Sequence, residues 1–153
     1  MRVAFAADHA GAVLKGELLR RLGDAAGGRE LIDLGGDGSD PADDYPDFAQ
    51  RLGEAIKSGE ADRGILICGS GVGASIAACK IRGVRAAVCH DTYSAHQGVE
   101  HDDMNVLVLG SRVIGPELAY ECAVAFLAAS FSGEARHQRR LDKVLAIESE
   151  EAT

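Results

Sequence analysis

The chain has 153 residues and a mass of 16.0 kDa, which favours one domain with a single buried core. Its formal net charge of −8 and its lack of Trp disfavour binding to nucleic acid or to an anionic membrane. No apolar run approaches the roughly 20 residues that cross a bilayer, and the N-terminus lacks the apolar region of a signal peptide, so we expect a cytoplasmic protein.

Five short apolar runs predict β-strands, at residues 2–7, 30–35, 64–69, 85–90 and 105–110. They lack strict alternation of apolar and polar residues, which is typical of strands covered on both faces. Segments with helical periodicity lie between them; one apolar stripe, for example, consists of Leu14, Leu18 and Leu22. Alternating strands and helices predict an α/β domain with a parallel sheet over residues 1–147. Residues 148–153 (ESEEAT) are predicted to be a frayed acidic tail.

The helical segment at 115–131 is apolar on nearly all sides. Pro116 stands in its first turn, where the missing N–H costs nothing, and Glu117 lies at the positive end of the helix dipole. One face of a sheet does not need so much apolar surface, and we therefore expect part of this helix to lie in a subunit interface.

Ligands of parallel α/β sheets bind at the carboxyl ends of the strands. Polar residues gather at those ends in this sequence: Asp8 and His9 follow the first strand, residues 68–73 the third, and His90 and Asp91 the fourth. We therefore expect the functional site at this edge of the sheet.

The segment GILICGSGVGASIAA, residues 64–78, places a thiol and three glycines between a strand and a helix. Gly69, Gly71 and Gly73 allow backbone N–H groups to point inward around an anion. The start of the helix favours the thiolate form of Cys68, which then can act as a general base, while the amides hold the resulting oxyanion. From this loop alone, a buried structural cysteine explains the pattern equally well.

Two other functions use similar loops. Gly69, Gly71 and Ala74 fit a dinucleotide-binding fingerprint with Asp91 about 20 residues further on. However, the loop follows the third strand instead of the first, and the chain is little more than half as long as a usual two-domain dehydrogenase. A phosphatase of the C-x5-R kind requires Arg where this chain has Ala74.

The remaining cysteines and the histidines predict neither a disulfide nor a metal site. The chain has no C-x-x-C pair and no zinc-like spacing, so we expect reduced thiols, with Cys79, Cys89 and Cys122 as small core residues. No pair of the histidines considered has metal-ligand spacing, and we predict that no metal or other cofactor is required.

The segment ARHQRRLDK, residues 135–143, is the only dense cationic stretch. Arg136 and Arg140 are spaced i, i+4, which places two guanidinium groups on one helix face, an arrangement suited to a phosphate monoester or, equally, to a solvated surface. In EHDDMN, residues 100–105, His101 stands beside carboxylates ahead of the fifth strand. Two interpretations are equally compatible with this position: His101 is a protonated acid, or it is part of a polar turn.

Together, five segments closely resemble the type B ribose-5-phosphate isomerases, a family that also includes isomerases of galactose, allose and tetrose phosphates. The segments are ADHAG, DYPDFA, ILICGSGVGASIAACKIRGVRAAVCHDTYSA, HDDMNVLVLGSRVIG and RHQRRLDK. The resemblance implies a three-layer Rossmann-like fold with a five-stranded parallel sheet and a metal-free aldose–ketose isomerase. It also implies a homodimer or a dimer of dimers, with the sugar phosphate bound at the interface.

The resemblance further assigns roles to residues of this chain. Cys68 would move a proton between C1 and C2 of the opened sugar, and Asp8 and His101 would serve ring opening and hydroxyl binding. The enediolate oxygens would be stabilised by Ser70 and by the amides of Gly69, Gly71, Val72, Gly73 and Ala74. The phosphate would be held by His9, Arg136 and Arg140, with Tyr45 and Arg112 lining the site.

The chain departs from the pattern of the ribose-type enzymes at three positions. Asp102 replaces an Asn that contacts sugar hydroxyls, and because a carboxylate normally only accepts hydrogen bonds, a tetrose or hexose phosphate becomes the alternative substrate. Cys79 replaces another Asn, with an expected effect on helix packing only. Ser70 replaces the more frequent Thr and keeps the hydroxyl. A subunit of a two-chain isomerase is a further alternative.

Overall fold

A computed structural model of the protein describes residues 1–25 and 27–151. In this part of the chain, five parallel strands form one sheet in the order β2-β1-β3-β5-β4. The strands are β1 (Arg2–Ala7), β2 (Glu30–Asp33), β3 (Arg63–Cys68), β4 (Ala86–Val88) and β5 (Val106–Gly110). The helices are α1 (Ala12–Asp24), α2 (Tyr45–Ser58), α3 (Val72–Ala78), α4 (Thr92–Asp102), α5 (Pro116–Ala128) and α6 (Ala135–Glu151). The predicted α/β class and parallel five-stranded sheet are confirmed.

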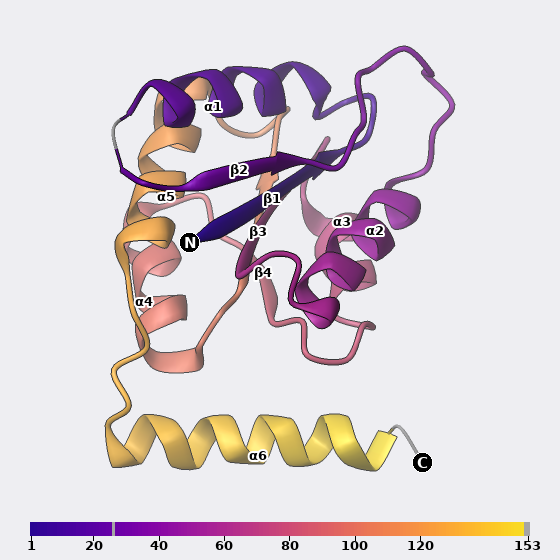
Figure 1. Ribbon diagram of the computed structural model, residues 1–153. Helices are drawn as coiled ribbons and strands as arrows, with labels where there is room; N and C mark the ends of the chain where they lie inside the picture. The colour runs from indigo at the N-terminus through magenta and orange to yellow at the C-terminus, as the bar shows by residue number, and fades with distance from the viewer. Residues whose placement is uncertain (26, 152–153) are drawn as a thin grey trace.

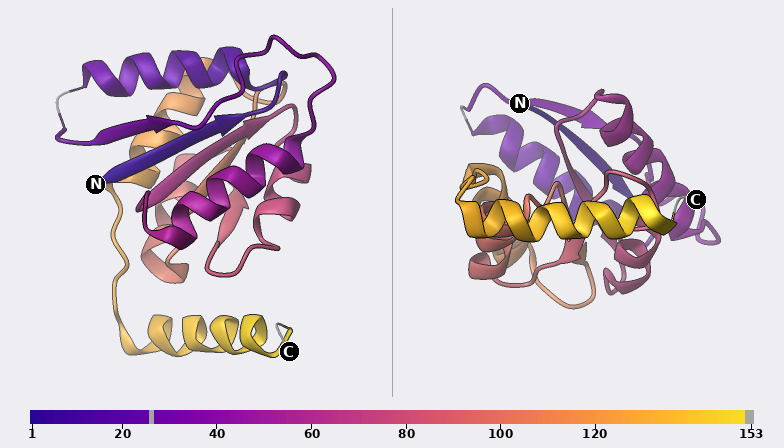
Figure 2. Two further views of the ribbon diagram at one scale, coloured as in Figure 1. Left: turned by 45° about the vertical axis from the view of Figure 1, so that its right-hand side comes forward. Right: turned by 90° about the horizontal axis from the view of Figure 1, so that it is seen from below.

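Two helical layers enclose the sheet (Figures 1 and 2). One core packs Val3 and Phe5 of β1 against α1, α4 and α5, and a second core packs Ala4 and Ala6 of the same strand against α2 and α3. Neighbouring residues of a strand point to opposite faces, so a strand that is covered on both sides must be apolar throughout. This explains the unbroken apolar runs and confirms the three layers.

The strand order of the sheet changes direction between the neighbouring strands β1 and β3. β2 lies on one side of β1, and the later strands lie on the other side. The turn after β1 comes close to β3: Asp8 N donates to Ile67 O (3.3 Å), and a Cβ on Gly11 would overlap the same carbonyl oxygen. In open α/β sheets, ligands bind at such a reversal point, outside the carboxyl ends of the strands.

α5 packs within the chain, between α1 and α4. Cys122, Ala123 and Phe126 are fully buried, whereas Val124 is exposed. Contacts within the chain therefore account for most of the apolar surface that suggested an interface helix. In the described part of the chain, no helix is both long enough and apolar enough to cross a membrane.

Of the three cysteines predicted to lie in the core, two do so. Cys89 and Cys122 are buried, and burial raises the pKa of each thiol to about 11, which keeps them protonated near neutral pH. The prediction was wrong for Cys79, which is exposed at the C-terminal end of α3 with Sγ 3.2 Å from Ala86 O. Cys79 is the C-cap of α3 and directly follows Ala78, the last residue of this helix that is buried in the core.

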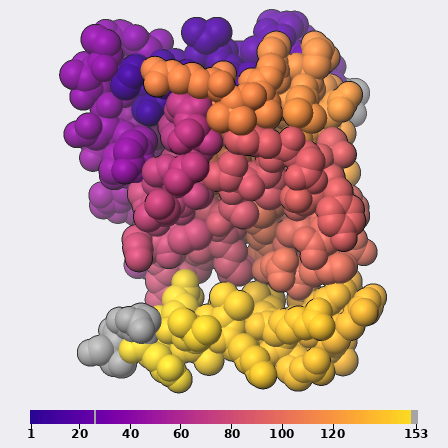
Figure 3. All heavy atoms as spheres, turned by 180° about the vertical axis from the view of Figure 1, so that it is seen from behind, coloured from indigo at the N-terminus to yellow at the C-terminus, as the bar shows by residue number. Residues whose placement is uncertain are grey.

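α6 lies outside the three layers and contacts α4 (Figures 1 and 2). A groove of about 730 Å³ runs between α6 and the segment around β4, and α6 forms its lower wall in Figure 3. Val144, Leu145 and Ile147 of α6 line this groove and are exposed. Of the predicted acidic tail, residues 148–151 form the end of α6, and residues 152 and 153 lie outside the described residues.

We predict that Gly36→Ala strongly destabilises the protein. Gly36 has φ +88°, and an added Cβ would overlap the carbonyl oxygen of Ala7 at the end of β1. Gly59 is a matched control, because it also has a positive φ (+77°) but has no atom within 4 Å of its ideal Cβ. We expect urea denaturation to show a loss of about 1–2 kcal/mol for Gly59→Ala and at least about 3 kcal/mol for Gly36→Ala. Equal losses of unfolding free energy in the two variants would show that the added Cβ at position 36 does not overlap the Ala7 carbonyl oxygen.

Candidate active site

A pocket of about 320 Å³ lies at the carboxyl ends of β1 and β3. Its lining contains seven of the residues that the sequence predicted for the site, and one, Val113, that it did not. The residues are Asp8, Tyr45, Cys68, Gly69, Ser70, Gly73, Arg112 and Val113. Segments that are far apart in the sequence therefore meet at the reversal point of the sheet.

Cys68 is the last residue of β3, and it lines the pocket although only 5% of its surface is exposed. The backbone N–H of Gly71 donates to its Sγ at 3.1 Å. Gly71 adopts φ +84°, a left-handed conformation that glycine reaches without strain and that turns the chain at the start of α3. The sulfur thus lies in a small cavity beside a backbone N–H donor.

The loop after Cys68 contributes both amides and a hydroxyl. Ser70 Oγ accepts a hydrogen bond from Val72 N (3.2 Å), which fixes the serine side chain at the pocket. Gly73 and Ala74 belong to the first turn of α3, where amide N–H groups have no acceptor within the helix. A Cβ on Gly73 would lie 2.6 Å from the ring of Tyr45, so glycine is required for the ring to pack on the loop.

The segment after β5 forms the second wall of the pocket. Ser111 N and Arg112 N donate to the carbonyl oxygens of Cys68 and Gly69, both at 2.9 Å. The Arg112 guanidinium lies against Gly69, where an added Cβ would be 3.4 Å from its Nη1. Because these backbone bonds hold the two loops together, a cationic group stands beside the loop amides and the thiol.

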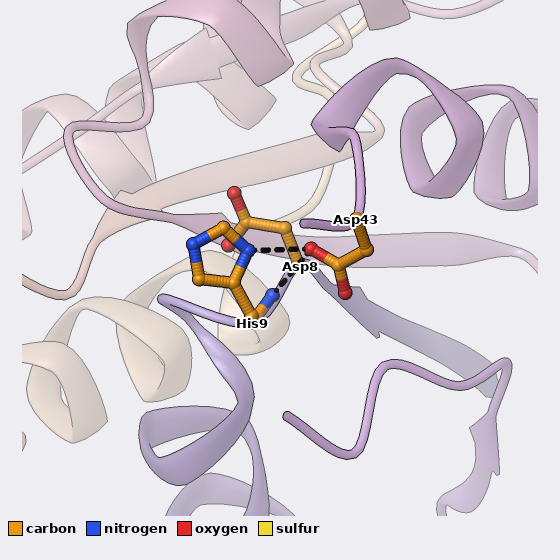
Figure 4. A group of neighbouring side chains, drawn as sticks. All are labelled: Asp8, His9 and Asp43. Atoms are coloured by element: carbon orange, nitrogen blue, oxygen red, sulfur yellow. Dashed lines mark hydrogen bonds and ion pairs between the residues drawn. The ribbon is translucent and has the colours of Figure 1, made fainter. Parts of the chain in front are cut away.

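Asp8, His9 and Asp43 form a polar cluster at this edge (Figure 4). Asp8 is 7% exposed, and its Oδ1 accepts from Gly11 N at 3.0 Å. His9 Nδ1 lies 2.6 Å from Asp43 Oδ1, and this hydrogen bond is the main cause that raises the pKa of His9. Side-chain atoms of the three residues lie within 4.8 Å of one another, a spacing that also permits a metal ion. Hydrogen bonding accounts for the contact of His9 with Asp43, and the absence of a metal site stays a prediction.

Eight predicted residues do not line this pocket. Four of them are direct neighbours in the chain of residues that do: His9, Gly71, Val72 and Ala74. The other four are His101, Asp102, Arg136 and Arg140. α4 starts after β4 at the edge that contains the pocket and ends just before β5 begins. With 11 residues it spans about 16 Å. His101 and Asp102 lie in its last turn and therefore at the opposite edge of the sheet. His101 is helical and not part of a polar turn.

His101 is held by two neighbours. Its Nδ1 lies 2.8 Å from Gln97 Nε2. Its ring stacks on that of His137 from α6, with 4.0 Å between centroids. His137 is 1% exposed, its Nδ1 lies 2.6 Å from Ser132 Oγ, and its buried Nε2 has no partner among the described residues. Burial is the largest cause that lowers the pKa of His137, so this ring is neutral near pH 7.

Arg136 and Arg140 lie on α6, as their i, i+4 spacing predicted, and both are exposed. Arg136 Nε donates to Glu134 Oε2 at 2.9 Å. Asp102 lines the groove beside α6. The residues predicted for one site therefore form two groups in a single chain, one at each edge of the sheet.

Sequence reasoning did not assign Asp43 and His137. Asp43 is one of four aspartates in the polar segment at 35–46, and nothing in the pattern distinguishes it from the others. His137 stands among arginines that suggested a solvated face. Its spacing of four residues from Leu141, which is buried on the same helix face, was the available signal.

The structure explains two residues that were compared with the dinucleotide-binding and phosphatase motifs without either function. Asp91 is the N-cap of α4, and its side chain accepts from Ser94 N at 2.6 Å, so a ribose contact is not needed to explain it. Ala74 is fully buried beneath the loop. The phosphatase arginine therefore has no counterpart at this position.

Comparison with known proteins shows which proteins this chain resembles over its length. Residues 3–144 match the family described as Ribose/Galactose Isomerase. The chain is 47% identical to ribose-5-phosphate isomerase B of Escherichia coli over 96% of each chain. It is 54% identical to a D-erythrulose-4-phosphate isomerase of Pectobacterium atrosepticum over 58% of this chain and 59% of that protein. The structure of ribose-5-phosphate isomerase B from Mycoplasma genitalium with bound ribulose 5-phosphate matches with a TM-score of 0.89 and 39% identity, covering 97% of each chain.

Proposed function

The chain belongs to the Ribose/Galactose Isomerase family and is a sugar phosphate isomerase, and from this premise we propose that it interconverts ribose 5-phosphate and ribulose 5-phosphate. The observation that carries the proposal is the pocket in which the sulfur of Cys68 lies beside loop amides and Arg112. An aldose–ketose isomerisation needs a base, donors for an oxyanion and an anchor for the distant phosphate, and this chain has candidates for each.

In the proposed reaction, the Cys68 thiolate removes the proton from C2 of the open-chain aldose. The electron pair forms the C1–C2 double bond, and the charge moves to the carbonyl oxygen to give a cis-enediolate. Amides of the loop and Ser70 Oγ stabilise its oxygens. The thiol returns the proton to C1, the hydroxyl proton passes from O2 to O1, and the ketose is formed. No redox partner is consumed, and we propose that no metal is required.

Ring opening and phosphate binding require the residues at both edges of the sheet. Asp8 and His9 are part of the pocket edge, whereas His101, Arg136 and Arg140 are at the other edge. We infer that a second copy of the chain brings its His101, Asp102 and α6 arginines to the pocket, so that each site is formed by two chains. The exposed apolar side chains of α6 along the groove are a suitable contact surface for such a dimer. In this arrangement His101 is the acid for ring opening.

The substrate assignment has one alternative that a specific residue favours. Asp102 offers a carboxylate to the sugar hydroxyls, and a relative named for a four-carbon sugar phosphate is 54% identical over part of the chain. A tetrose phosphate is therefore the second candidate, with allose and galactose 6-phosphates behind it.

We expect a turnover panel to distinguish these substrates. The purified protein is assayed alone on ribose 5-phosphate, erythrulose 4-phosphate, allose 6-phosphate and galactose 6-phosphate. The highest kcat/KM is expected for ribose 5-phosphate, the sugar phosphate for which the similar proteins of Escherichia coli and Mycoplasma genitalium are named. A higher kcat/KM of the wild type for the four-carbon substrate, together with a shift of preference toward ribose 5-phosphate in Asp102→Asn, would contradict the ribose 5-phosphate assignment. The tetrose phosphate would then be the assigned substrate. Inactivity on all four substrates would contradict a self-sufficient enzyme.

A further inference from the structure

The segment 35–44, between β2 and α2, is tied to the pocket edge at both of its ends. At its start, the buried Lys15 Nζ donates to Asp33 Oδ1 (2.6 Å) and Gly35 O (3.0 Å). At its end, the carboxylate of Asp43 meets His9, 34 positions earlier in the chain (Figure 4). The Asp43 side chain is only 15% exposed, so this hydrogen bond is partly shielded from water.

One oxygen of Asp43 accepts two hydrogen bonds from the same residue. His9 N donates to Asp43 Oδ1 at 2.9 Å, and His9 Nδ1 lies 2.6 Å from that oxygen. The backbone bond fixes the position of His9, and the ring bond fixes its rotation. The other ring nitrogen, Nε2, points away from Asp43 in Figure 4.

The ionised carboxylate of Asp43 also determines which ring nitrogen of His9 carries a proton. A carboxylate only accepts hydrogen bonds, so Nδ1 must hold a proton in this contact. A neutral His9 then has a lone pair at Nε2, which repels a phosphate oxygen. A protonated His9 has N–H at both nitrogens and can donate from Nε2 to an anion. Anion binding by this ring therefore requires the imidazolium form.

The charges around His9 favour this form. Asp43 and Asp8 both raise the pKa of His9, and Arg112 from the segment after β5 lowers it. The net direction is upward, so the imidazolium persists to a higher pH than in an ordinary histidine. It is present below the raised pKa and is lost as the pH rises through it.

We propose that Asp43 is a positioning residue for phosphate recognition, which holds the ring of His9 and makes its Nε2 a cationic donor to the substrate phosphate. This rests on the proposed function, in which His9 contacts the phosphate. Asp43 itself does not touch the substrate; it acts through His9. The segment 35–44 thereby couples the end of β2 to the anion subsite.

The test compares Asp43→Asn with Asp47→Asn. Asparagine keeps the size of Asp43 and an acceptor oxygen but removes its charge. Asp47 is an exposed carboxylate in the first turn of α2, so its replacement removes the same charge from the neighbouring surface. Histidine-labelled protein is titrated by NMR, with the His9 signal assigned among the five histidines by His9→Gln.

We expect the titration midpoint of His9 to fall in Asp43→Asn and to remain at the wild-type value in Asp47→Asn. Inorganic phosphate should raise the midpoint in the wild type, because the anion stabilises the imidazolium. Its affinity, measured by calorimetry, should be about tenfold lower in Asp43→Asn at about pH 7.5. The difference from wild type should become smaller at about pH 5.5, because a lower pH favours the imidazolium of His9 in both proteins. With sugar phosphate, KM should rise more than kcat falls.

An unchanged His9 midpoint in Asp43→Asn, or a loss of phosphate affinity that is the same at both pH values, would overturn the proposal. Asp43→Ala provides a second variant, since it releases the ring and should make phosphate binding less dependent on pH. The NMR and calorimetric readouts do not need turnover. A wild-type protein that binds phosphate through His9 but isomerises no sugar phosphate would contradict the proposed function and leave the role of Asp43 supported.

Discussion

Cys68→Ala is expected to lower kcat on the sugar phosphate substrate by about 10²–10⁴-fold while the protein stays folded. The sulfur lies at the end of β3 in the pocket and accepts a hydrogen bond from Gly71 N, so the substitution removes the proposed base and leaves the loop in place. Because one small buried group is lost, the free energy of unfolding should fall by only about 1 kcal/mol. Steady-state kinetics and urea denaturation measure the two effects separately.

Cys89→Ala is the matched control for this substitution. Cys89 has the same exposed fraction, 5%, but packs on the opposite side of the sheet, with Sγ 4.0 Å from Met104 Sδ. Burial holds its pKa near 11, so it has no role as a base near neutral pH. Full activity is expected for Cys89→Ala. If Cys68→Ala retained turnover near the wild-type level, Cys68 would not be the base.

Mixed dimers of Cys68→Ala and Arg140→Ala chains are expected to regain activity that neither variant has alone. Cys68 lies at the carboxyl ends of the strands and Arg140 on α6 beyond the other edge, so a site formed by two chains takes one residue from each. In a mixed dimer, one site lacks both groups and the other is intact. Random association makes half of the dimers mixed, and the mixture should therefore show about a quarter of wild-type activity.

The control for mixing is a pair of variants from the same edge of the sheet. Cys68 and Arg112 line the same pocket, so mixed dimers of Cys68→Ala and Arg112→Ala contain one defect in every site and should remain inactive. Co-expression with two different affinity tags isolates the mixed species, and turnover per dimer is then measured. A mixed Cys68→Ala and Arg140→Ala dimer without regained activity would show that the two edges do not form a common site.

The sequence by itself determined the layers of the fold. The run at residues 64–69 has apolar side chains on both faces, and only a strand enclosed by two helical layers places all of them out of water. The predicted strands agree with the observed ones within two residues at either end, because glycines and polar residues end each apolar run. Asp8, Cys68 and the loop after it were expected together because parallel strands bring all their carboxyl ends to one edge.

The tertiary structure alone decided which of the predicted residues lie away from this pocket and which unpredicted residues contact the site. The spacing of Arg136 and Arg140 predicts a helix face, but the position of that helix depends on the course of residues 129–134, which carry no regular pattern. His101 was placed at the opposite edge by the length of α4, and Asp43 was selected from four aspartates by a contact across 34 residues. Local periodicity reports which side of an element is buried, whereas such contacts depend on how elements that are distant in the chain pack together.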